Sequence, residues 1–179
     1  LYTYCPEFES AQDPLIRHQG RDVLMLGTNS YLGLATHPRI KDAAHNAIDK
    51  YGSGCSGSPL LNGTLDLHNQ LSVDLSNFLS KQDALLFSTG YQTNVGVISA
   101  LVNRHDVLIL DERNHASLID GARLSGATFA RYRHNDMTSL EAVLEKYANR
   151  PKLVVTDSLF SMEGTIIDLP RIVELAKQY

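Results

Sequence analysis

The sequence has little of several features that would point to particular classes of protein. It contains only two cysteines, Cys5 and Cys55, and no Cys-x-x-Cys pair. This argues against a structural zinc site or a disulfide framework and favours a reducing compartment. No apolar run is long enough to cross a membrane, and the first residues show no basic region followed by an apolar stretch. We therefore expect a cytoplasmic protein without a membrane span.

Charge and histidine spacing argue against two further classes. The formal net charge is -4 over 179 residues, so no basic field is present to attract nucleic acid. No metal-ligand spacing such as His-Glu-x-x-His occurs, and we expect no metal site. The histidines considered for that role are His37, His45, His68 and His105. With 43 % hydrophobic and 20 % charged residues, the chain instead has the balance of an ordinary globular domain.

Strand and helix patterns alternate along most of the chain. Short apolar runs predict strands at 21–26, 84–87, 107–110, 127–131 and 152–156. Apolar periodicity predicts helices at 38–51, 65–78, 91–102, 116–124, 137–147 and 169–178, the second with Thr64 as its N-cap. Such alternation is typical of an α/β fold with a mostly parallel sheet, in which ligands bind beyond the carboxyl ends of the strands. The segments that follow the strands are therefore the places to look for chemistry.

A glycine-rich loop at residues 52–63 contains Gly52-Ser-Gly-Cys-Ser-Gly57, which matches the pattern G-x-G-x-x-G. A dinucleotide site needs a strand before these glycines and a helix directly after them, whereas here a helix precedes them. Three interpretations remain open at this point: a nucleotide-binding loop, a tight surface turn, or a flexible loop lining the entrance to an active site.

The predicted strand at 84–87 is followed by Ser88, Thr89, Gly90 and Tyr91, which open a helix. The first turn of a helix offers unpaired N–H groups and a positive dipole end, which together suit a phosphate. Gly90 would let the backbone come close to the ligand. The alternative is ordinary capping of the helix by a hydroxyl side chain.

Polar loops also follow the strands at 107–110 and 152–156. The first contains His115, at a position where a bound ring could stack on the imidazole; a solvated or capping histidine is the alternative. The second contains Ser161 beside two large apolar residues, which is unusual because loops are mostly polar. The alternative there is a turn capped by Ser161, with Phe160 and Met162 packed under the sheet edge.

Two other polar segments have simpler explanations. Asn29 lies in NSYLGL after the first predicted strand, where asparagine and glycine are common turn formers. In His134-Asn135-Asp136, an N-cap at Asn135 or Asp136 accounts for the pattern.

Taken together and in order, these segments resemble the α-oxoamine synthase family of fold-type I enzymes that depend on pyridoxal 5′-phosphate (PLP). The resemblance runs from about Arg21 to Tyr179. It rests on NSYLGL (29–34), GSGCSG…LNGT (52–64), FSTGYQTN (87–94), NHASLIDG (114–121), HNDM (134–137) and TDSLFSMEG (156–164). Among members, it is closer to serine palmitoyltransferase-like and ketobutyrate-ligase-like enzymes than to aminolevulinate synthase.

The resemblance implies a role for each candidate residue. Backbone N–H groups of Gly90 and Tyr91, next to Thr89, would hold the PLP phosphate. His115 would stack on the pyridine ring and, by keeping it oriented, would be the catalytic residue. Ser161 would contact the cofactor near its ring oxygen. The resemblance therefore assigns the cofactor to a site built mainly from the loops after three strands.

The resemblance also implies an activity and a division of the chain. Asn29 would lie near the substrate carboxylate, and the reaction would condense an amino acid with an acyl-CoA or acyl-carrier thioester, usually with loss of CO₂, giving an α-amino ketone. Residues 1–36 would form an N-terminal arm, and residues 37–179 the N-terminal part of the fold-type I large domain. A homodimer is implied as well. A non-catalytic partner subunit and a nucleotide-binding α/β module remain as alternatives.

Two departures from the family pattern stand out. Many members have arginine directly after the serine of the glycine loop, where this chain has Pro59 after Ser58. The family places an Asp that pairs with the pyridine nitrogen, and the lysine that binds the cofactor, beyond the position of Tyr179. None of the six lysines here lies in such a context: Lys41, Lys50, Lys81, Lys146, Lys152 and Lys177. We therefore expect a chain cut at both ends and inactive by itself.

Overall fold

The structure is a computed structural model that describes residues 5–179, and it divides into two compact units between Gln82 and Asp83. We call residues 5–82 unit 1 and residues 83–179 unit 2. Among the described residues, no helix combines the length and apolarity needed to cross a lipid bilayer. The predicted N-terminal arm, 1–36, includes four residues outside the described part, and its boundary with a large domain stays a prediction.

Unit 2 is built on a parallel sheet of three strands, as the alternating pattern predicts. The strands are β3 (Val107–Asp111), β4 (Thr128–Tyr132) and β5 (Lys152–Val155), in the order β4-β3-β5. Val107 is opposite Thr128 on one side and Lys152 on the other. The helices are α3 (Gly90–Leu101), α4 (Ala116–Ser125), α5 (Met137–Lys146) and α6 (Leu169–Gln178).

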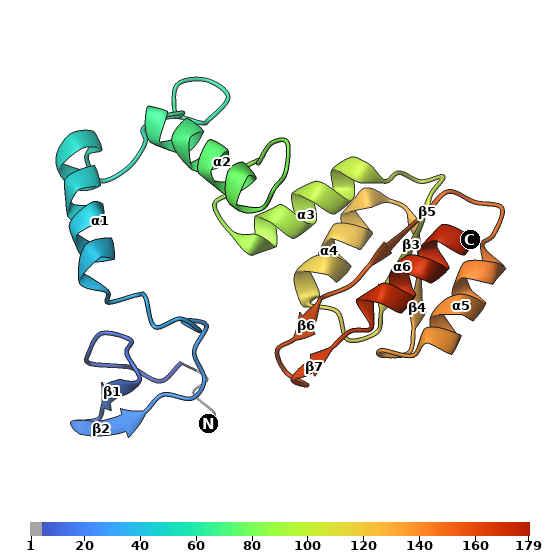
Figure 1. Ribbon diagram of the computed structural model, residues 1–179, viewed down its shortest axis with the longest axis horizontal. Helices are drawn as coiled ribbons and strands as arrows, with labels where there is room; N and C mark the ends of the chain where they lie inside the picture. Colours follow the sequence, from blue (N-terminus) through green and yellow to red (C-terminus); the bar gives the residue numbers. More distant parts are fainter. Residues whose placement is uncertain (1–4) are drawn as a thin grey trace. The chain divides into compact units, whose positions relative to one another are not determined.

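The central strand β3 divides the core into two layers, because successive side chains of a strand point to opposite faces. Val107 and Ile109 pack with buried residues of α5 and α6. Leu108 and Leu110 pack with buried residues of α3 and α4. The helix pairs therefore cover opposite faces of the sheet (Figure 1).

This arrangement gathers the candidate loops at one edge of the sheet. Residues 102–106 join the end of α3 to the start of β3, so α3 begins near the edge where β3 ends. The loops after β3 and β5 lie at the same edge, since parallel strands end on the same side. We call this the carboxyl edge. It positions the start of α3, residue 115 and the segment after Val155 in one region.

After β5, the chain forms a short antiparallel hairpin that the sequence patterns miss. Strands β6 (Leu159–Phe160) and β7 (Thr165–Ile166) pair with each other. Gly164 adopts φ 67° and its N–H donates to the Phe160 carbonyl at 2.7 Å, which closes the turn. Phe160 is buried in the core, whereas Met162 is exposed, so only the first packs as the simpler interpretation predicts.

Unit 1 begins with a hairpin, only half of which is predicted. Strand β1 (Leu15–His18) pairs antiparallel with β2 (Arg21–Leu24), the shorter form of the strand predicted at 21–26. Gln19 and Gly20 both have positive φ in the two-residue turn, a geometry that matches the twist of paired strands. The hairpin was not predicted because Gln19 at the first turn position does not match the usual Asn-Gly or Gly-Gly pattern.

Two helices follow in unit 1. Helix α1 (Pro38–Tyr51) has the predicted bounds, with proline in the first turn and Gly52 at φ 80° after its end. Helix α2 (Asp66–Phe78) starts one residue later than predicted. Thr64 is not its N-cap: the hydroxyl donates to the Pro59 carbonyl at 2.8 Å and closes the glycine loop instead. The N-cap is Leu65, whose backbone N–H donates to the His68 ring.

The strand predicted at 84–87 does not form, which corrects the sequence interpretation. The segment has no regular structure and pairs with no strand among residues 5–179. A strand is stabilised by its neighbour's hydrogen bonds, so an apolar run alone does not make one. Within the part of the chain that the structure describes, strand β5 likewise pairs only with β3. A mostly apolar groove of about 560 Å³ lies between the other edge of β5, α3 and α6.

Helices α3 and α4 pack closely at Gly121. A Cβ at that position would lie 3.1 Å from both the Asn94 carbonyl oxygen and Ile98. We predict that Gly121→Val lowers the free energy of unfolding of the whole protein by about 1–3 kcal/mol, because overpacking forces the helices apart. Chemical denaturation would measure this. Gly27→Val is the matched control, since nothing lies within 4 Å of that Cβ position. Equal stability of the two variants would contradict the packing argument.

Tyr132 is 1 % exposed, and its hydroxyl has no hydrogen-bond partner among the described residues. Burial raises the pKa of Tyr132 to about 12, from about 10 in an exposed tyrosine. Between these pH values the unfolded state has lost the proton and the folded state keeps it. We therefore predict that stability falls by up to about 2–3 kcal/mol from pH 10 to 12, and that Tyr132→Phe removes this loss. Denaturation midpoints measured across that pH range test this, with exposed Tyr31→Phe as the control that should lose stability as the wild type does. If Tyr132→Phe also loses stability as the wild type does, the prediction is wrong.

Candidate active site

The first turn of α3 leaves two backbone donors open. Thr89 is the N-cap, and its Oγ1 accepts from the Gln92 N–H at 3.1 Å. The N–H groups of Gly90 and Tyr91 have no partner among the described residues. Nothing lies within 4 Å of a Cβ built on Gly90. Capping and an anion-binding helix end are therefore compatible here, because the cap uses one donor and leaves two free.

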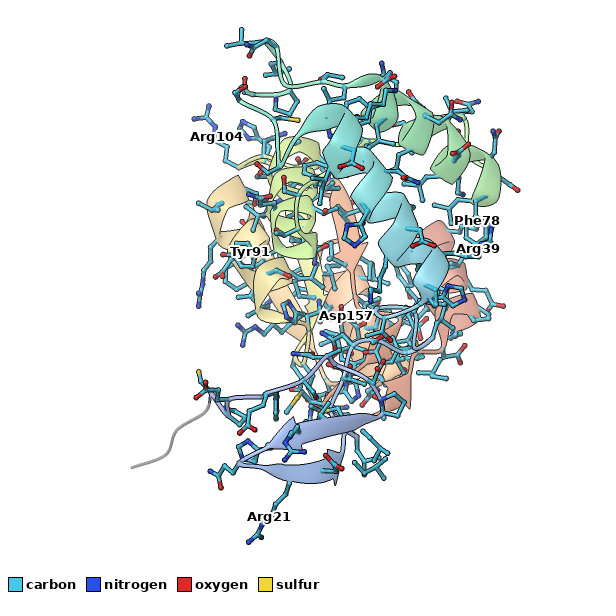
Figure 2. All side chains as sticks on the ribbon, turned by 90° about the vertical axis from the view of Figure 1, so that its left-hand side faces the viewer. Arg21, Arg39, Phe78, Tyr91, Arg104 and Asp157 are labelled. Carbon is cyan, nitrogen blue, oxygen red and sulfur yellow. The ribbon has the colours of Figure 1, made fainter. Side chains whose placement is uncertain are left out.

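The side chain of Tyr91 points towards α4 (Figure 2). Its hydroxyl donates to the Asp120 carboxylate at 3.0 Å. The hydrogen bond to Asp120 raises the pKa of Tyr91 above its usual value. The tyrosine side chain thus ties the start of α3 to α4 and leaves the Tyr91 backbone N–H open.

His115 is fixed at both its ring and its backbone. As N-cap of α4, its Nδ1 accepts from the Ser117 N–H at 3.2 Å and lies 2.7 Å from the Ser117 Oγ. Ser117 Oγ in turn accepts from Asn94 Nδ2 at 2.9 Å, and Asn94 lies one turn after Gly90 in α3. The His115 N–H donates to Asp157 at 2.8 Å. The imidazole is therefore held near the first turn of α3.

The loops after β3 and β5 hold each other through Asn114 and Asp157. Asn114 is buried, and its amide donates to the Val155 carbonyl at 2.8 Å while accepting from the Asp157 N–H at 3.3 Å. Asp157 lies just beyond β5 (Figure 2). Sequence reasoning missed both residues, although their positions directly after strands mark them as candidates.

Ser161 shares a small cavity with His115. The cavity measures about 90 Å³ and is lined by Arg113, His115, Asp157, Leu159, Phe160, Ser161, Met162 and Glu163. Arg113 and Glu163 form an ion pair of 2.9 Å that joins the β3–α4 loop to the β6–β7 turn. The structure thus brings together two predicted cofactor residues from segments 46 positions apart in the sequence.

A buried network holds the β6–β7 hairpin in place. Asp111 is 0 % exposed and accepts from the N–H groups of Arg113 and Asn135, each at 2.9 Å. It also accepts from His134 Nδ1 at 3.0 Å, and His134 Nε2 lies 2.8 Å from the Thr165 hydroxyl. Asp136 is the N-cap of α5, as predicted. The sequence pattern did not indicate that His134 links β3 to the hairpin.

Two other candidate segments belong to unit 1. Asn29 is exposed in the loop between β2 and α1. The glycine loop follows α1, and α2 starts only at Asp66, so the strand–glycine–helix arrangement of a dinucleotide site is not there. The loop is tightly folded: a Cβ at Gly63 would lie 1.9 Å from the Gly57 carbonyl oxygen. A compact turn describes the loop better than a flexible one.

The lysines of unit 2 all lie away from the carboxyl edge. Lys152 begins β5, at the opposite edge, and its Nζ donates to the carbonyls of Ala148 and Tyr179. Lys146 and Lys177 lie in the last turns of α5 and α6. Both helices begin at the carboxyl edge and run away from it, so their last turns lie at the opposite edge. No lysine of unit 2 is therefore placed to reach a ligand beside His115. Among the described residues, no cluster of side chains could hold a metal ion.

Comparison with known proteins identifies the family. Residues 21–179 match the aminotransferase class I and II family. The chain belongs to this family. It is 51 % identical to a serine palmitoyltransferase of Sphingobacterium spiritivorum and to a putative 8-amino-7-oxononanoate synthase 2 of Mycobacterium tuberculosis, in each case over 100 % of this chain. The alignments cover 45 % and 23 % of those proteins.

Solved structures agree with this aminotransferase class I and II assignment. A serine palmitoyltransferase from S. paucimobilis with bound PLP–myriocin aldimine superposes with a TM-score of 0.94 and 36 % identity, covering 98 % of this chain and 44 % of that one. The fold-type I assignment and the resemblance to α-oxoamine synthases are confirmed. The chain spans less than half the length of these relatives.

Thr89 should stabilise α3 as well as shape its open end. We predict that Thr89→Ala lowers the free energy of unfolding by about 1 kcal/mol through loss of the cap, and that Thr89→Ser retains it. Thr93→Ala is the control, because its hydroxyl contacts only the Thr89 carbonyl within the same helix. Urea unfolding of the whole protein would measure the difference. If alanine at 89 and at 93 had the same effect, the cap would contribute nothing.

Proposed function

We propose that the whole protein binds PLP and uses it to condense an amino acid with an acyl thioester, with decarboxylation, to form an α-amino ketone. The observation that carries this proposal is the open N–H pair of Gly90 and Tyr91 beside a fixed His115. Relatives named serine palmitoyltransferase and 8-amino-7-oxononanoate synthase support it, because both belong to the α-oxoamine synthase family.

The residues present fit a phosphorylated aromatic ring. Two free backbone donors at a helix start suit a phosphate, and the space at Gly90 leaves room for its oxygens. The imidazole of His115 is held by two contacts to Ser117 and its backbone by one to Asp157, and the residue remains exposed, as a stacking partner must be. The cavity beside it, about 90 Å³, is smaller than a cofactor pocket, so other walls must complete the site.

In this proposal each group of the chain has one task. Thr89, Gly90 and Tyr91 bind the phosphate, and Ser161 approaches the ring oxygen. His115 keeps the ring in a fixed plane, which matters because a misplacement of about 1 Å can cost roughly 10²-fold in rate. Bound PLP supplies an electron sink that stabilises negative charge on the amino acid's α-carbon. Asn29 binds the substrate carboxylate, and residues 37–179 belong to the large domain.

Localisation and assembly are also part of the proposal. We place the protein in the cytoplasm, in keeping with its two unpaired cysteines. We also propose a homodimer. Helix α1 buries none of its residues, and Ile40 and Ile48 on its apolar stripe are about half exposed. Such a face needs a covering surface, which a second copy would supply.

The non-catalytic partner subunit is the second candidate, because the family pattern places the lysine that decides between the two beyond the position of Tyr179. The intact set of Thr89, Gly90, His115 and Ser161 favours the enzyme, since a subunit without chemistry has no need to preserve it. Reading the complete polypeptide for a lysine in a Ser/Thr-rich loop separates the two.

The proposal predicts that the whole protein is yellow with PLP and is bleached by borohydride. His115→Ala should weaken PLP binding roughly three- to tenfold, because it removes the stacked ring. An absorbance titration measures this. His105→Ala, in the loop between α3 and β3, is the control and should bind PLP as the wild type does.

Turnover is measured as thiol released from an acyl-CoA in the presence of serine, glycine or alanine, with palmitoyl-CoA and a short-chain thioester as alternatives. Release that depends on both PLP and one amino acid is the expected result. A protein that binds PLP but releases no thiol with any pair, and that lacks the lysine, would be the non-catalytic subunit. Absence of PLP binding would overturn the proposal.

A further inference from the structure

We propose that Asn94 and Ser117 are positioning residues that fix the His115 imidazole in a single tautomer, with the proton on Nε2 and Nδ1 as acceptor. This inference rests on the proposed function for the use made of the ring. The hydrogen bonds that define it belong to this chain alone and do not depend on a ligand.

The tautomer follows from the one contact whose direction is certain. A backbone N–H can only donate, so the 3.2 Å contact from the Ser117 N–H requires a lone pair on His115 Nδ1. A neutral ring with a lone pair on Nδ1 carries its proton on Nε2. The Ser117 hydroxyl, 2.7 Å from the same nitrogen, must then donate as well.

Asn94 completes the chain of donors. Once the Ser117 hydroxyl donates its hydrogen bond to Nδ1, its oxygen has only lone pairs left for other partners. Asn94 Nδ2 donates to that oxygen at 2.9 Å. The order Asn94 to Ser117 to His115 therefore has one consistent direction. A proton on Nδ1 would instead face the amide N–H of Ser117, so the backbone contact excludes it, and the bond from Asn94 holds the Ser117 hydroxyl where it can donate to Nδ1.

The chain of hydrogen bonds from Asn94 to Ser117 to His115, which we call the relay, lies where α3 packs on α4. Ser117 is 0 % exposed, and Gly121, one turn further along α4, allows the close approach of α3 that brings Asn94 within reach. Asn94 lies on the same helix, one turn after Gly90. The helix that offers open N–H groups to a phosphate thus also sets the orientation of the imidazole. A shift of α3 would move both together.

The direct test is the ¹⁵N spectrum of histidine-labelled whole protein, without PLP and with it. The His115 signals are assigned by their loss in His115→Gln. We expect an unprotonated Nδ1 and a protonated Nε2 in the wild type. The backbone N–H at position 117 remains in Ser117→Ala and Asn94→Ala, so Nε2 should stay the main protonated nitrogen, with a minor Nδ1-protonated population that the wild type lacks. Ser117→Thr should restore the wild-type pattern. Ser125→Ala is the control, because that hydroxyl bonds only to the Ala122 carbonyl and the Ala127 N–H at the far end of α4.

Kinetics provide the second measurement. Ser117→Ala should lower kcat roughly three- to tenfold, as expected for the loss of one orienting hydrogen bond, with little change in KM for the thioester. Ser117→Thr should recover most of the rate. If Ser117→Ala does not fold, the spectrum and rate of Asn94→Ala decide the matter in the same way.

The outcomes separate this inference from the proposed function. A wild-type ring protonated at Nδ1, or a Ser117→Ala protein with the spectrum and kcat of Ser125→Ala, overturns the positioning role even if PLP binds. The predicted tautomer in a protein that never binds PLP would leave the relay intact and overturn the proposed function instead.

Discussion

The close packing of α3 on α4 is the contact on which the candidate site depends. It is possible because Gly121 of α4 has no side chain at the point where it faces Asn94 and Ile98 of α3. The same contact brings Asn94, in the first turns of α3, against Ser117 at the start of α4. Two helices that otherwise only cover the sheet thereby fix both an open helix end and an imidazole.

The sheet determines where this helix pair can act. Helices cover both faces of β3, so polar groups of this strand and its neighbours can reach a ligand only at the strand ends. The parallel strands β4 and β5 end at the same edge as β3. Asp111 and Asn114 then fasten those loops to β4, β5 and the β6–β7 hairpin. Buried polar groups are costly unless they are satisfied, so this network strongly favours one arrangement of the loops.

Much of unit 2 could be predicted from the sequence because its signals are local. Helix periods, apolar strands and the cap at Thr89 are each set by residues within one or two turns. The elements that were missed depend on distant partners. The run at 84–87 lacks a paired strand, and the β6–β7 hairpin is held by His134, some 25 residues before it. Ser117 and Asn94 escaped notice for the same reason: 23 positions separate them.

The central claim is that the start of α3 binds a phosphate while His115 covers the attached ring. A crystal structure of the whole protein with PLP would test it most directly. We expect phosphate oxygens within hydrogen-bond distance of the Gly90 and Tyr91 N–H groups, with the imidazole parallel to the pyridine ring. A phosphate bound elsewhere, or an imidazole turned away from the ring, would contradict it.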